Sequence, residues 1–347
     1  MLILLNFRLV AILGFGNLFF VSFDITSLVS GPEILITEIP AIPGPEDSAY
    51  IVIKSIIASI EFKYINFSMI IWIASYPKSG NTYLRSLISA YFFSDSGKFD
   101  FDLLLNISQF PSLKFSKNDL FSRKDAAQNW ILNQNHFFNS KDRFLKTHNT
   151  LGEYEGYKFT SSKQTVGGIY IVRDPRNVIL SMSHHYSLSF DEAYNRLIDN
   201  KSSLLEKTFN NDHSNFTFLG SWSKHYKSWR DNNEFKILFL KYEDFENNIE
   251  KEFKKILSFI YGLRKEKFII DENKFLKAIK STKFNNLRNN EKISGFEESV
   301  NSDKGKKLQF FNLGFQNKWQ KKLPDDIVQK VNMNLNKELI ELGYSLK

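Results

Sequence analysis

The stretch YPKSGNTY, residues 76–83, combines residue types that can hold a phosphate group. It follows the apolar segment MIIWIAS and precedes a segment of helical period, so it predicts a turn between a strand and a helix N-terminus. Gly80 permits a backbone conformation that is closed to other residues, and Asn81 or Thr82 is expected to cap the helix. The backbone N–H groups and the positive end of the helix dipole at such a turn attract an anion. The turn therefore predicts a phosphate cradle.

Three side chains strengthen this interpretation, because Lys78 adds a mobile positive charge and the hydroxyls of Ser79 and Thr82 can donate to phosphate oxygens. The order of residues differs from the Walker A motif GxxxxGK[ST], since Lys78 precedes Gly80. This order argues against an ATP or GTP loop. Taken alone, the stretch also fits an ordinary turn between a strand and a helix with an incidental lysine and serine.

Apolar segments that alternate with helical patterns are expected to position this turn. The candidate strands are rich in Val, Ile, Leu and Phe, which is typical of buried parallel strands, and they are Met69–Ser75, Arg143–Thr147, Gly168–Val172 and Lys236–Leu240. The candidate helices are Thr82–Phe93, Arg176–His185, Phe190–Asn200, Leu219–Asn232 and Asn248–Tyr261. We therefore expect a single α/β domain with a central parallel sheet flanked by helices and a P-loop-like phosphate-binding turn.

The amino-acid composition excludes several kinds of catalytic and metal site. The chain of 347 residues has no cysteine, which excludes disulfides, thiolate nucleophiles and cysteine-ligated zinc, and which suits a reducing compartment. Its 6 histidines form no HExxH-like cluster, so we expect no metal site. These features favour a cytoplasmic enzyme without a metal.

Charge is divided unevenly along the chain. Residues 1–68 hold 3 basic and 6 acidic side chains, which leaves 43 basic and 32 acidic side chains for residues 69–347. The positive excess accompanies the part that carries the phosphate-binding turn, as expected for a protein that binds anions.

The first 68 residues differ from the rest, and we expect a boundary between an atypical extension, 1–68, and a domain, 69–347. Residues 9–23 are apolar over a length that fits a signal-peptide core, whereas residues 31–48 carry four of the 8 prolines and predict neither a helix nor a compact strand pair. Three interpretations are open: a signal or membrane anchor, a disordered extension, or translation from a start assigned too early. We favour the third, because Met69 stands directly before the first strand of the domain.

At this point the residues resemble a known family. YPKSGNTY is similar to the 5′-phosphosulfate-binding loop of the sulfotransferases that use 3′-phosphoadenosine 5′-phosphosulfate (PAPS), whose usual form is YPKSGTTW. The second signature of that family resembles VRDPRNVILSMSHHY, residues 172–186. The resemblance implies that Arg173 and Ser181 approach the 3′-phosphate of the cofactor. It also implies that the loop itself binds the cofactor, through Lys78, Ser79, Gly80, Asn81, Thr82 and Tyr83.

Further segments extend the resemblance over most of residues 69–320. FLKTH places Lys146 and His148 at the family's active-site Lys-x-His, at the end of a strand. Tyr242 corresponds to the tyrosine beside the adenine. The residues Thr282 and Phe284 in STKFNNLRNN correspond to the pair that lines the adenine pocket. Gly314 matches the glycine of the C-terminal signature.

That C-terminal signature, roughly RKGxxGxW, is incomplete. Asn312 and Leu313 replace the Arg and Lys that usually hold the 3′-phosphate. Two explanations are open: Lys304, Lys306 and Lys307 compensate, or the affinity for the cofactor is weaker than is typical.

The resemblance implies sulfuryl transfer with PAPS as co-substrate and no metal. Positioning and electrostatic stabilisation should supply most of the catalysis. Lys78 would stabilise the bridging oxygen and the leaving phosphate, Lys146 would assist the sulfuryl oxygens, and His148 would accept the proton of the acceptor.

Two other classes of function remain open, namely a nucleotide or nucleoside kinase with a variant loop and a noncatalytic basic protein that binds anions. The expected acceptor is a hydroxyl, or an amine, of a small molecule or a carbohydrate, and we expect no nucleic-acid partner. A membrane is involved only if residues 9–23 act as an anchor or an export signal. The sequence does not indicate an oligomeric state.

Overall fold

The computed structural model describes residues 3–12, 20–29, 34–36, 70–116, 120–135, 143–205, 212–300 and 308–346. The chain divides into two compact units, Met1–Phe67 and Ser68–Lys347. Lys304, Lys306 and Lys307, which are one of the two open explanations for the missing Arg and Lys, lie outside the described residues. No helix within the described ranges is long and apolar enough to span a membrane.

The first unit contains an antiparallel sheet of three strands, β1 (Ile3–Ile12), β2 (Phe20–Val29) and β3 (Ile34–Ile36), in the order β1-β2-β3. The strand β3 lies within residues 31–48, for which we expected neither a helix nor a compact strand pair, and the other residues of that segment lie outside the described residues. Three residues of that segment pair with the end of β2, where the β-branched and leucine side chains of ILI favour extended backbone.

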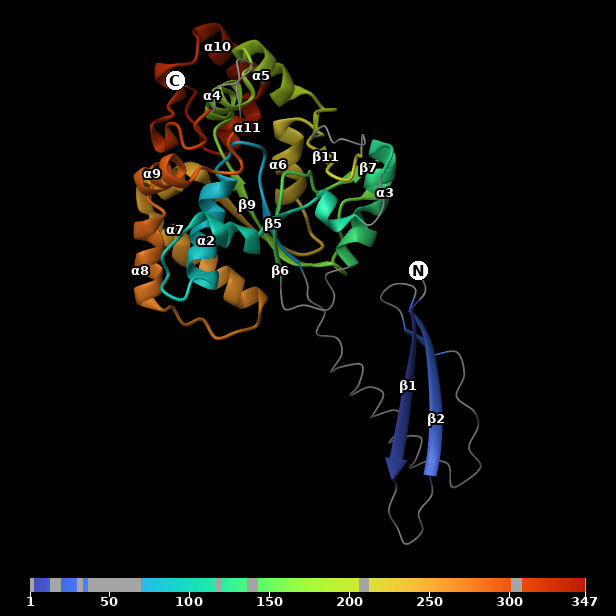
Figure 1. The fold of residues 1–347 in the computed structure, drawn as a ribbon. Helices are drawn as coiled ribbons and strands as arrows, with labels where there is room; N and C mark the ends of the chain where they lie inside the picture. Colours follow the sequence, from blue (N-terminus) through green and yellow to red (C-terminus); the bar gives the residue numbers. More distant parts are fainter. Residues whose placement is uncertain are drawn as a thin grey trace. The chain divides into compact units, whose positions relative to one another are not determined.

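The second unit is built on a parallel sheet of five strands (Figure 1). Its strands, in the order of the sheet, are β12 (Lys236–Lys241), β9 (Thr165–Val172), β4 (Ile70–Ala74), β6 (Arg143–Thr147) and β5 (Ser108–Gln109). All neighbouring pairs are parallel, so the predicted α/β class is confirmed. The four predicted strands are present, and β5 is an additional strand at one edge.

Both faces of this sheet are buried, and the central strand β4 shows how. Trp72 and Ala74 point into one hydrophobic cluster, whereas Ile71 and Ile73 point into the other, as the alternation of side chains along a strand requires. All five residues of β4 are buried. Burial of each large apolar side chain contributes roughly 1.5–3 kcal/mol to stability.

Helices cover the two faces (Figure 1). The cluster around Trp72 includes residues of α3 (Arg123–Gln134), α4 (Pro175–Tyr186), α5 (Phe190–Ile198), α6 (Trp222–Arg230), α10 (Asp325–Asn334) and α11 (Asn336–Glu341). The cluster around Ile71 includes residues of α2 (Asn81–Phe93), α7 (Tyr242–Leu263), α8 (Glu272–Ser281) and α9 (Phe284–Ser294). The short elements are η1 (Phe101–Asn106), η2 (Leu113–Phe115), β7 (Glu153–Tyr154), β8 (Tyr157–Lys158), β10 (Ser203–Leu204), β11 (Thr217–Phe218), η4 (Gly314–Gln316) and η5 (Trp319–Lys321).

The register of the sheet brings four strand ends to one edge. Ala74 of β4 pairs with Thr147 of β6 and with Tyr170 of β9, and Val172 pairs with Lys241 of β12. The residues that directly follow these strands therefore meet at the carboxyl edge, where ligands bind in open α/β sheets. The chain order also reverses there, since β6 and β9 flank β4 on opposite sides.

Candidate functional site

A cavity of about 1040 Å³ lies at the carboxyl edge of the sheet. This volume is at the upper end of the range for small-molecule sites. Most of the residues predicted from the sequence line it, namely Lys78, Gly80, Asn81, Thr82, Tyr83, Lys146, His148, Arg173, Ser181, Tyr242, Phe284 and Gly314. Ser79 and Thr282 are buried beside it and do not line it.

The turn after β4 has an unusual backbone. Lys78 has φ 65° and Gly80 has φ 97°, both in the left-handed region. Such a conformation is uncommon for a lysine, and residues held in it cluster at ligand sites. Gly80 is also closely packed, because a Cβ placed there would lie 2.3 Å from Cδ2 of Tyr242. A glycine is therefore required for two separate reasons.

The predicted capping of the following helix is wrong. Gly80 is the N-cap residue of α2, and no side chain among the residues that the structure describes caps the helix. The Asn81 amide instead donates to the carbonyl oxygen of Ile73 at 3.0 Å and to Ser75 Oγ at 3.2 Å, and the Thr82 hydroxyl donates to Glu298. The buried amide of Asn81 is thus hydrogen-bonded to the strand and not to the helix N-terminus. Within the described ranges, the first N–H groups of α2 consequently have neither an intrahelical nor a side-chain acceptor.

Buried polar atoms around the turn lack protein partners. Ser79 Oγ and Arg173 Nε are buried and make no hydrogen bond within the described part of the chain. Buried donors of this kind are costly to leave unpaired. Together with the free N–H groups of α2, they fit a ligand that carries several anionic oxygens.

Lys78 lies over the ring of Phe310, with Nζ 4.0 Å from the ring centroid. The pKa of Lys78 is lowered to about 7, mainly by burial and in part by the charges of Lys146 and Arg173, which outweigh the opposing effect of Glu298. Near neutral pH this ammonium group is therefore only partly protonated. An anionic ligand would restore its charge, because opposite charge favours the protonated form.

His148 follows β6 directly, and its ring faces the cavity. Nδ1 lies 2.8 Å from the carbonyl oxygen of Ser75 and 3.3 Å from its hydroxyl. Burial, with the positive charge of Lys146, lowers the pKa of His148 to about 3. The imidazole is therefore neutral at physiological pH, which a general base requires.

A second buried histidine supports His148 from behind. His225 on α6 lies with Nε2 3.0 Å from the carbonyl oxygen of His148 and with Nδ1 2.8 Å from the hydroxyl of Tyr170. Because a carbonyl only accepts, Nε2 donates and Nδ1 accepts from Tyr170. Burial lowers the pKa of His225 to about 4. This arrangement fixes the backbone of His148.

Arg173 and aromatic side chains form another part of the wall. The Arg173 guanidinium lies 4.5 Å from the ring centroid of Tyr242 and donates to the carbonyl oxygens of Lys78 at 3.1 Å and Gly314 at 3.4 Å. Tyr242 stacks on Phe315 with ring centroids 4.8 Å apart. This wall combines an aromatic surface, which suits the base of a nucleotide, with a guanidinium, which suits a phosphate group.

The C-terminal segment contributes to the same wall. Gly314 has φ 54°, and a Cβ placed there would lie 2.4 Å from the Phe284 ring. Asn312 and Leu313, which stand where an Arg and a Lys were expected, line the cavity. The Thr282 hydroxyl donates to the carbonyl oxygen of Ala278 at 2.8 Å, so it terminates α8.

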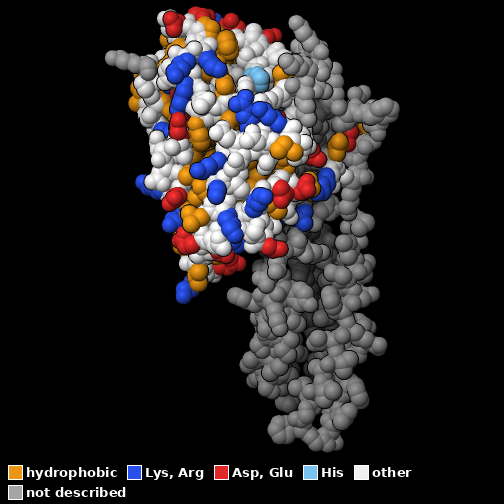
Figure 2. All heavy atoms as spheres, turned by 60° about the vertical axis from the view of Figure 1, so that its left-hand side comes forward, with side chains coloured by type: hydrophobic (Ala, Val, Ile, Leu, Met, Phe, Trp, Pro, Cys, Tyr) orange, Lys and Arg blue, Asp and Glu red, His pale blue; other side chains and the backbone are white. Residues whose placement is uncertain are grey.

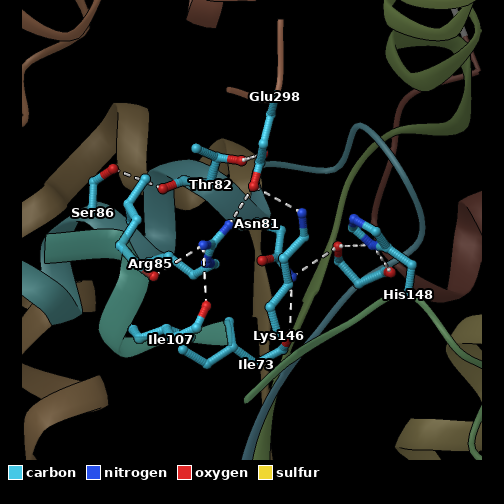
Figure 3. Close-up of polar contacts among 11 residues, drawn as sticks. Ile73, Asn81, Thr82, Arg85, Ser86, Ile107, Lys146, His148 and Glu298 are labelled. Carbon is cyan, nitrogen blue, oxygen red and sulfur yellow. Dashed lines mark hydrogen bonds and ion pairs between the residues drawn. The ribbon is translucent and has the colours of Figure 1, made fainter. Parts of the chain in front are cut away.

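Two charged residues of the site were not predicted from the sequence, namely Arg85 and Glu298. Figure 3 shows Thr82, Arg85 and Lys146 pointing toward the Glu298 carboxylate. Glu298 Oε1 lies 2.6 Å from Arg85 Nη1 and 3.0 Å from Lys146 Nζ, and Oε2 accepts from Thr82 Oγ1 at 2.8 Å. The sequence feature that could have indicated Arg85 is a single basic residue within an otherwise uncharged helix, whose first eleven residues are buried in the structure. Glu298 gives no such signal.

The surface charge is less concentrated than the charge of the site. Figure 2 shows lysine and arginine side chains spread over one face, with acidic and apolar side chains among them. By contrast Lys146 and Arg173 are each 6% exposed and line one cavity, and Arg85, which is 5% exposed, forms an ion pair with Glu298, a residue that lines the same cavity. Positive charge inside the cavity thus distinguishes this site from the surface.

Fold and site together define an α/β protein with a left-handed turn, beside buried cations, at the switch point of a parallel sheet. A family model for the sulfotransferase domain matches residues 69–343. The chain belongs to the sulfotransferase family.

Individual relatives are distant. Sulfotransferase 1E1 of Bos taurus is 29% identical over 220 residues, which are 63% of this chain and 65% of that protein. Sulfotransferase 4A1 of Homo sapiens is 27% identical over 187 residues, 52% of this chain and 55% of that protein. Cytosolic sulfotransferase 1 of Arabidopsis thaliana is 25% identical over 275 residues, 77% of each. The chain thus spans less than two thirds of the first two relatives.

Two solved structures are similar in fold. Mouse sulfotransferase SULT7A1 complexed with PAP has a TM-score of 0.49 and 18% identity, over 78% of this chain and 84% of that chain. Retinol dehydratase in a complex with retinol and PAP has a TM-score of 0.49 and 16% identity, over 80% and 83%.

Proposed function

We propose that this chain transfers the sulfuryl group of PAPS to a hydroxyl, or an amine, of a small-molecule or carbohydrate acceptor. The observation that carries the proposal is the convergence of the phosphate-binding turn with its Lys78, the His148 imidazole and the buried cations Lys146 and Arg173 on one cavity. Membership of the sulfotransferase family supports it independently.

The residues present fit the co-substrate. The N–H groups at the start of α2 and the side chains of Lys78 and Thr82 would hold the 5′-phosphosulfate, and the unpartnered hydroxyl of Ser79, buried beside the cavity, would support them. Arg173, with its unpartnered Nε, and Ser181 would hold the 3′-phosphate. Tyr83, Tyr242 and Phe284 would surround the adenine, with Thr282 behind them. Gly80, Asn81 and Gly314 would shape the backbone around the ligand.

When bound, PAPS supplies an activated sulfuryl group whose bond to the bridging oxygen breaks as the acceptor oxygen bonds to sulfur, and the electron pair leaves with adenosine 3′,5′-bisphosphate. Lys78 would neutralise the charge that grows on the bridging oxygen and the 5′-phosphate. Lys146 would stabilise the sulfuryl oxygens. Preorganised cations in a buried site stabilise developing charge more strongly than water does.

His148 would accept the proton of the acceptor at Nε2. Its Nδ1 faces a carbonyl oxygen, so the proton of the neutral ring resides on Nδ1 and the lone pair of Nε2 is available. Negative charge bound nearby would raise the low pKa of this imidazole, because it favours the imidazolium. The base would then gain strength only when the nucleotide is in place.

Ligand binding and transfer test the proposal. Adenosine 3′,5′-bisphosphate at ~100 times its dissociation constant should stabilise the chain by roughly 2.7 kcal/mol. Labelled PAPS incubated with a panel of phenols, alcohols, amines and carbohydrates should label at least one acceptor. Stabilisation by ATP with magnesium, without any by the bisphosphate, would instead indicate a kinase. Stabilisation by neither, with no transfer, would leave the noncatalytic anion-binding protein.

A further inference from the structure

Three donors around the Glu298 carboxylate form a compact oxyanion site. Thr82 Oγ1 reaches Oε2, whereas Arg85 Nη1 and Lys146 Nζ both reach Oε1, at 2.6–3.0 Å (Figure 3). Arg85 and Lys146 are 5% and 6% exposed. Two oxygens on one central atom, held by two cations and a hydroxyl, is the pattern by which proteins bind phosphate and sulfate.

Arg85 is held ready for this role by the protein around it. Its Nη2 donates to the carbonyl oxygens of Ile107 at 3.1 Å and Leu104 at 3.4 Å, which leaves Nη1 directed at Glu298. Arg85 lies three residues after Thr82 on α2, so both side chains project from the same side of the helix. The guanidinium is therefore fixed in orientation before any ligand arrives.

The backbone around Glu298 is anchored on both sides. Phe296 stacks on Phe101 with ring centroids 4.6 Å apart, and Ser299 Oγ donates to the buried Glu291 carboxylate at 2.7 Å. Glu291 also accepts from the backbone N–H groups of Phe310 and Phe311. This framework places the Glu298 side chain at the cavity. The rotatable bonds of that side chain allow the carboxylate to move without a change in the backbone.

A bound phosphosulfate and the Glu298 carboxylate compete for the same donors. The hydroxyl of Thr82 has one proton, and it is donated to Glu298. A second anion beside an ionised carboxylate is also repelled, strongly so away from water. Yet the buried charges of Arg85 and Lys146 need a negative partner at all times. Exchange of one anion for another satisfies both requirements.

From this geometry we infer that Thr82, Arg85 and Lys146 form the subsite for the sulfuryl or 5′-phosphate oxygens, and that Glu298 closes this subsite as an internal ligand which the nucleotide must displace. The inference rests on the proposed function for the identity of the ligand. It adds Arg85 as a ligand-binding residue and Glu298 as a built-in competitor. With an internal ligand, the apparent affinity equals the intrinsic affinity multiplied by the fraction of chains in which the internal ligand is not bound.

Titration calorimetry with adenosine 3′,5′-bisphosphate tests the inference. Glu298→Gln, which removes the competing charge and keeps the shape, should bind the bisphosphate about ten- to hundredfold more tightly than the wild type. Glu297→Gln is the matched control, because it removes the same charge from the neighbouring, exposed residue that also lines the cavity. It should change the affinity by less than about threefold. Equal gains in both variants, or no gain in Glu298→Gln, would overturn the inference.

Two further variants keep the test decisive. Glu298→Asp retains the charge but is too short to reach all three donors, so it should also bind more tightly, and it serves if Glu298→Gln does not fold. Arg85→Met combined with Glu298→Gln should lose most of the gain. A gain that persists without Arg85 would remove Arg85 from the subsite.

A parallel measurement with inorganic sulfate separates this inference from the proposed function. At constant ionic strength, sulfate should raise the melting temperature of Glu298→Gln more than that of the wild type or Glu297→Gln. If no variant binds the bisphosphate but Glu298→Gln gains sulfate, the proposed function fails and the oxyanion subsite stands. If the wild type binds the bisphosphate and Glu298→Gln binds neither ligand more tightly, the function stands and the internal ligand is refuted.

Discussion

His148 Nδ1 lies 2.8 Å from the carbonyl oxygen of Ser75, the residue that directly follows the central strand β4. The turn that begins at Ser75 also carries Lys78 and Gly80, so a single loop both contains the proposed anion site and sets the tautomer of the imidazole. Because a carbonyl oxygen can only accept, the neutral ring carries its proton on Nδ1. The nitrogen available as a base is Nε2, and the strand β4 determines this choice.

Replacement of His148 should separate chemistry from binding. In His148→Ala we expect kcat to fall by about 10²–10⁴-fold, because the proton acceptor is removed, while the affinity for adenosine 3′,5′-bisphosphate changes little. Single-turnover transfer from labelled PAPS and calorimetry measure the two quantities. A variant with wild-type turnover would assign the base to another residue. A variant that lost binding in proportion to turnover would indicate a structural role.

Lys78 gives a prediction for the dependence of affinity on pH. Burial lowers its pKa to about 7 in the free chain, so the ammonium form that attracts anions is lost as the pH rises above 7. The affinity for adenosine 3′,5′-bisphosphate should therefore fall by up to about tenfold per pH unit between pH 7 and 9, where the phosphates are already ionised. Lys78→Arg, which stays charged, should bind with a flatter pH dependence. Parallel profiles for the two proteins would contradict the assignment.

Arg173 should govern recognition of the 3′-phosphate. Its guanidinium is 6% exposed, and Nε has no partner within the described part of the chain. We expect Arg173→Ala to lose most of its preference for adenosine 3′,5′-bisphosphate over adenosine 5′-monophosphate, because only the former carries the second phosphate. Competition binding measures the ratio. An unchanged preference would place the 3′-phosphate elsewhere in the cavity.

Gly80 and Tyr242 provide a test of how the turn is built. Gly80→Ala must strain a left-handed backbone, at about 1–2 kcal/mol, and displace the Tyr242 ring, at about 1–3 kcal/mol more. Gly156→Ala is the matched control, because Gly156 has φ 85° but a Cβ placed there would meet no atom within 4 Å. Urea unfolding should show the larger loss of stability for Gly80→Ala. Equal losses would mean that the ring yields without cost.

The main elements of the fold could be predicted because they bury continuous apolar side chains. The strand Arg143–Thr147 has the predicted bounds, and β4 differs by one residue at each end. The helix α7 was predicted only in part. It consists of two helices joined at Asn248, whose φ of −155° and ψ of 83° are not helical and whose Oδ1 accepts from the N–H of Lys251 at 2.9 Å. The helix expected from Asn248 therefore begins there, whereas the preceding helical turns from Tyr242 were not predicted. The first turn and the second part bury different neighbours, which no periodicity reveals.

The site residues at the ends of strands could be predicted, whereas those from distant parts of the sequence were harder to predict. Lys146, His148 and Arg173 meet because parallel strands end at one edge. Glu298 lies 216 positions from Thr82 and stands in a segment without helical or strand periodicity. The failed prediction of a cap at Asn81 has the same cause, since a carbonyl oxygen of β4 outcompetes the helix for its amide.

Buried histidines should make the fold sensitive to acid. Burial lowers the pKa of His225 to about 4, and those of His148 and His185 to about 3, so the folded chain keeps these rings neutral. In the unfolded chain they bind protons below about pH 6.5. The free energy of unfolding should therefore be fully retained above pH 6.5 and should fall as the pH drops toward 4, by roughly 1.4 kcal/mol per pH unit for each ring.

His225 isolates one of these contributions, because its ring contacts Tyr170 and the His148 backbone and does not line the cavity. In His225→Gln we expect lower stability at every pH, since two buried hydrogen bonds are perturbed. Its stability should nevertheless decline less steeply than that of the wild type between pH 6.5 and 4.5, by roughly 1.4 kcal/mol per pH unit. Urea unfolding at four pH values measures the two slopes. Parallel slopes would mean that the His225 ring takes up a proton within the folded chain, against the burial seen around it.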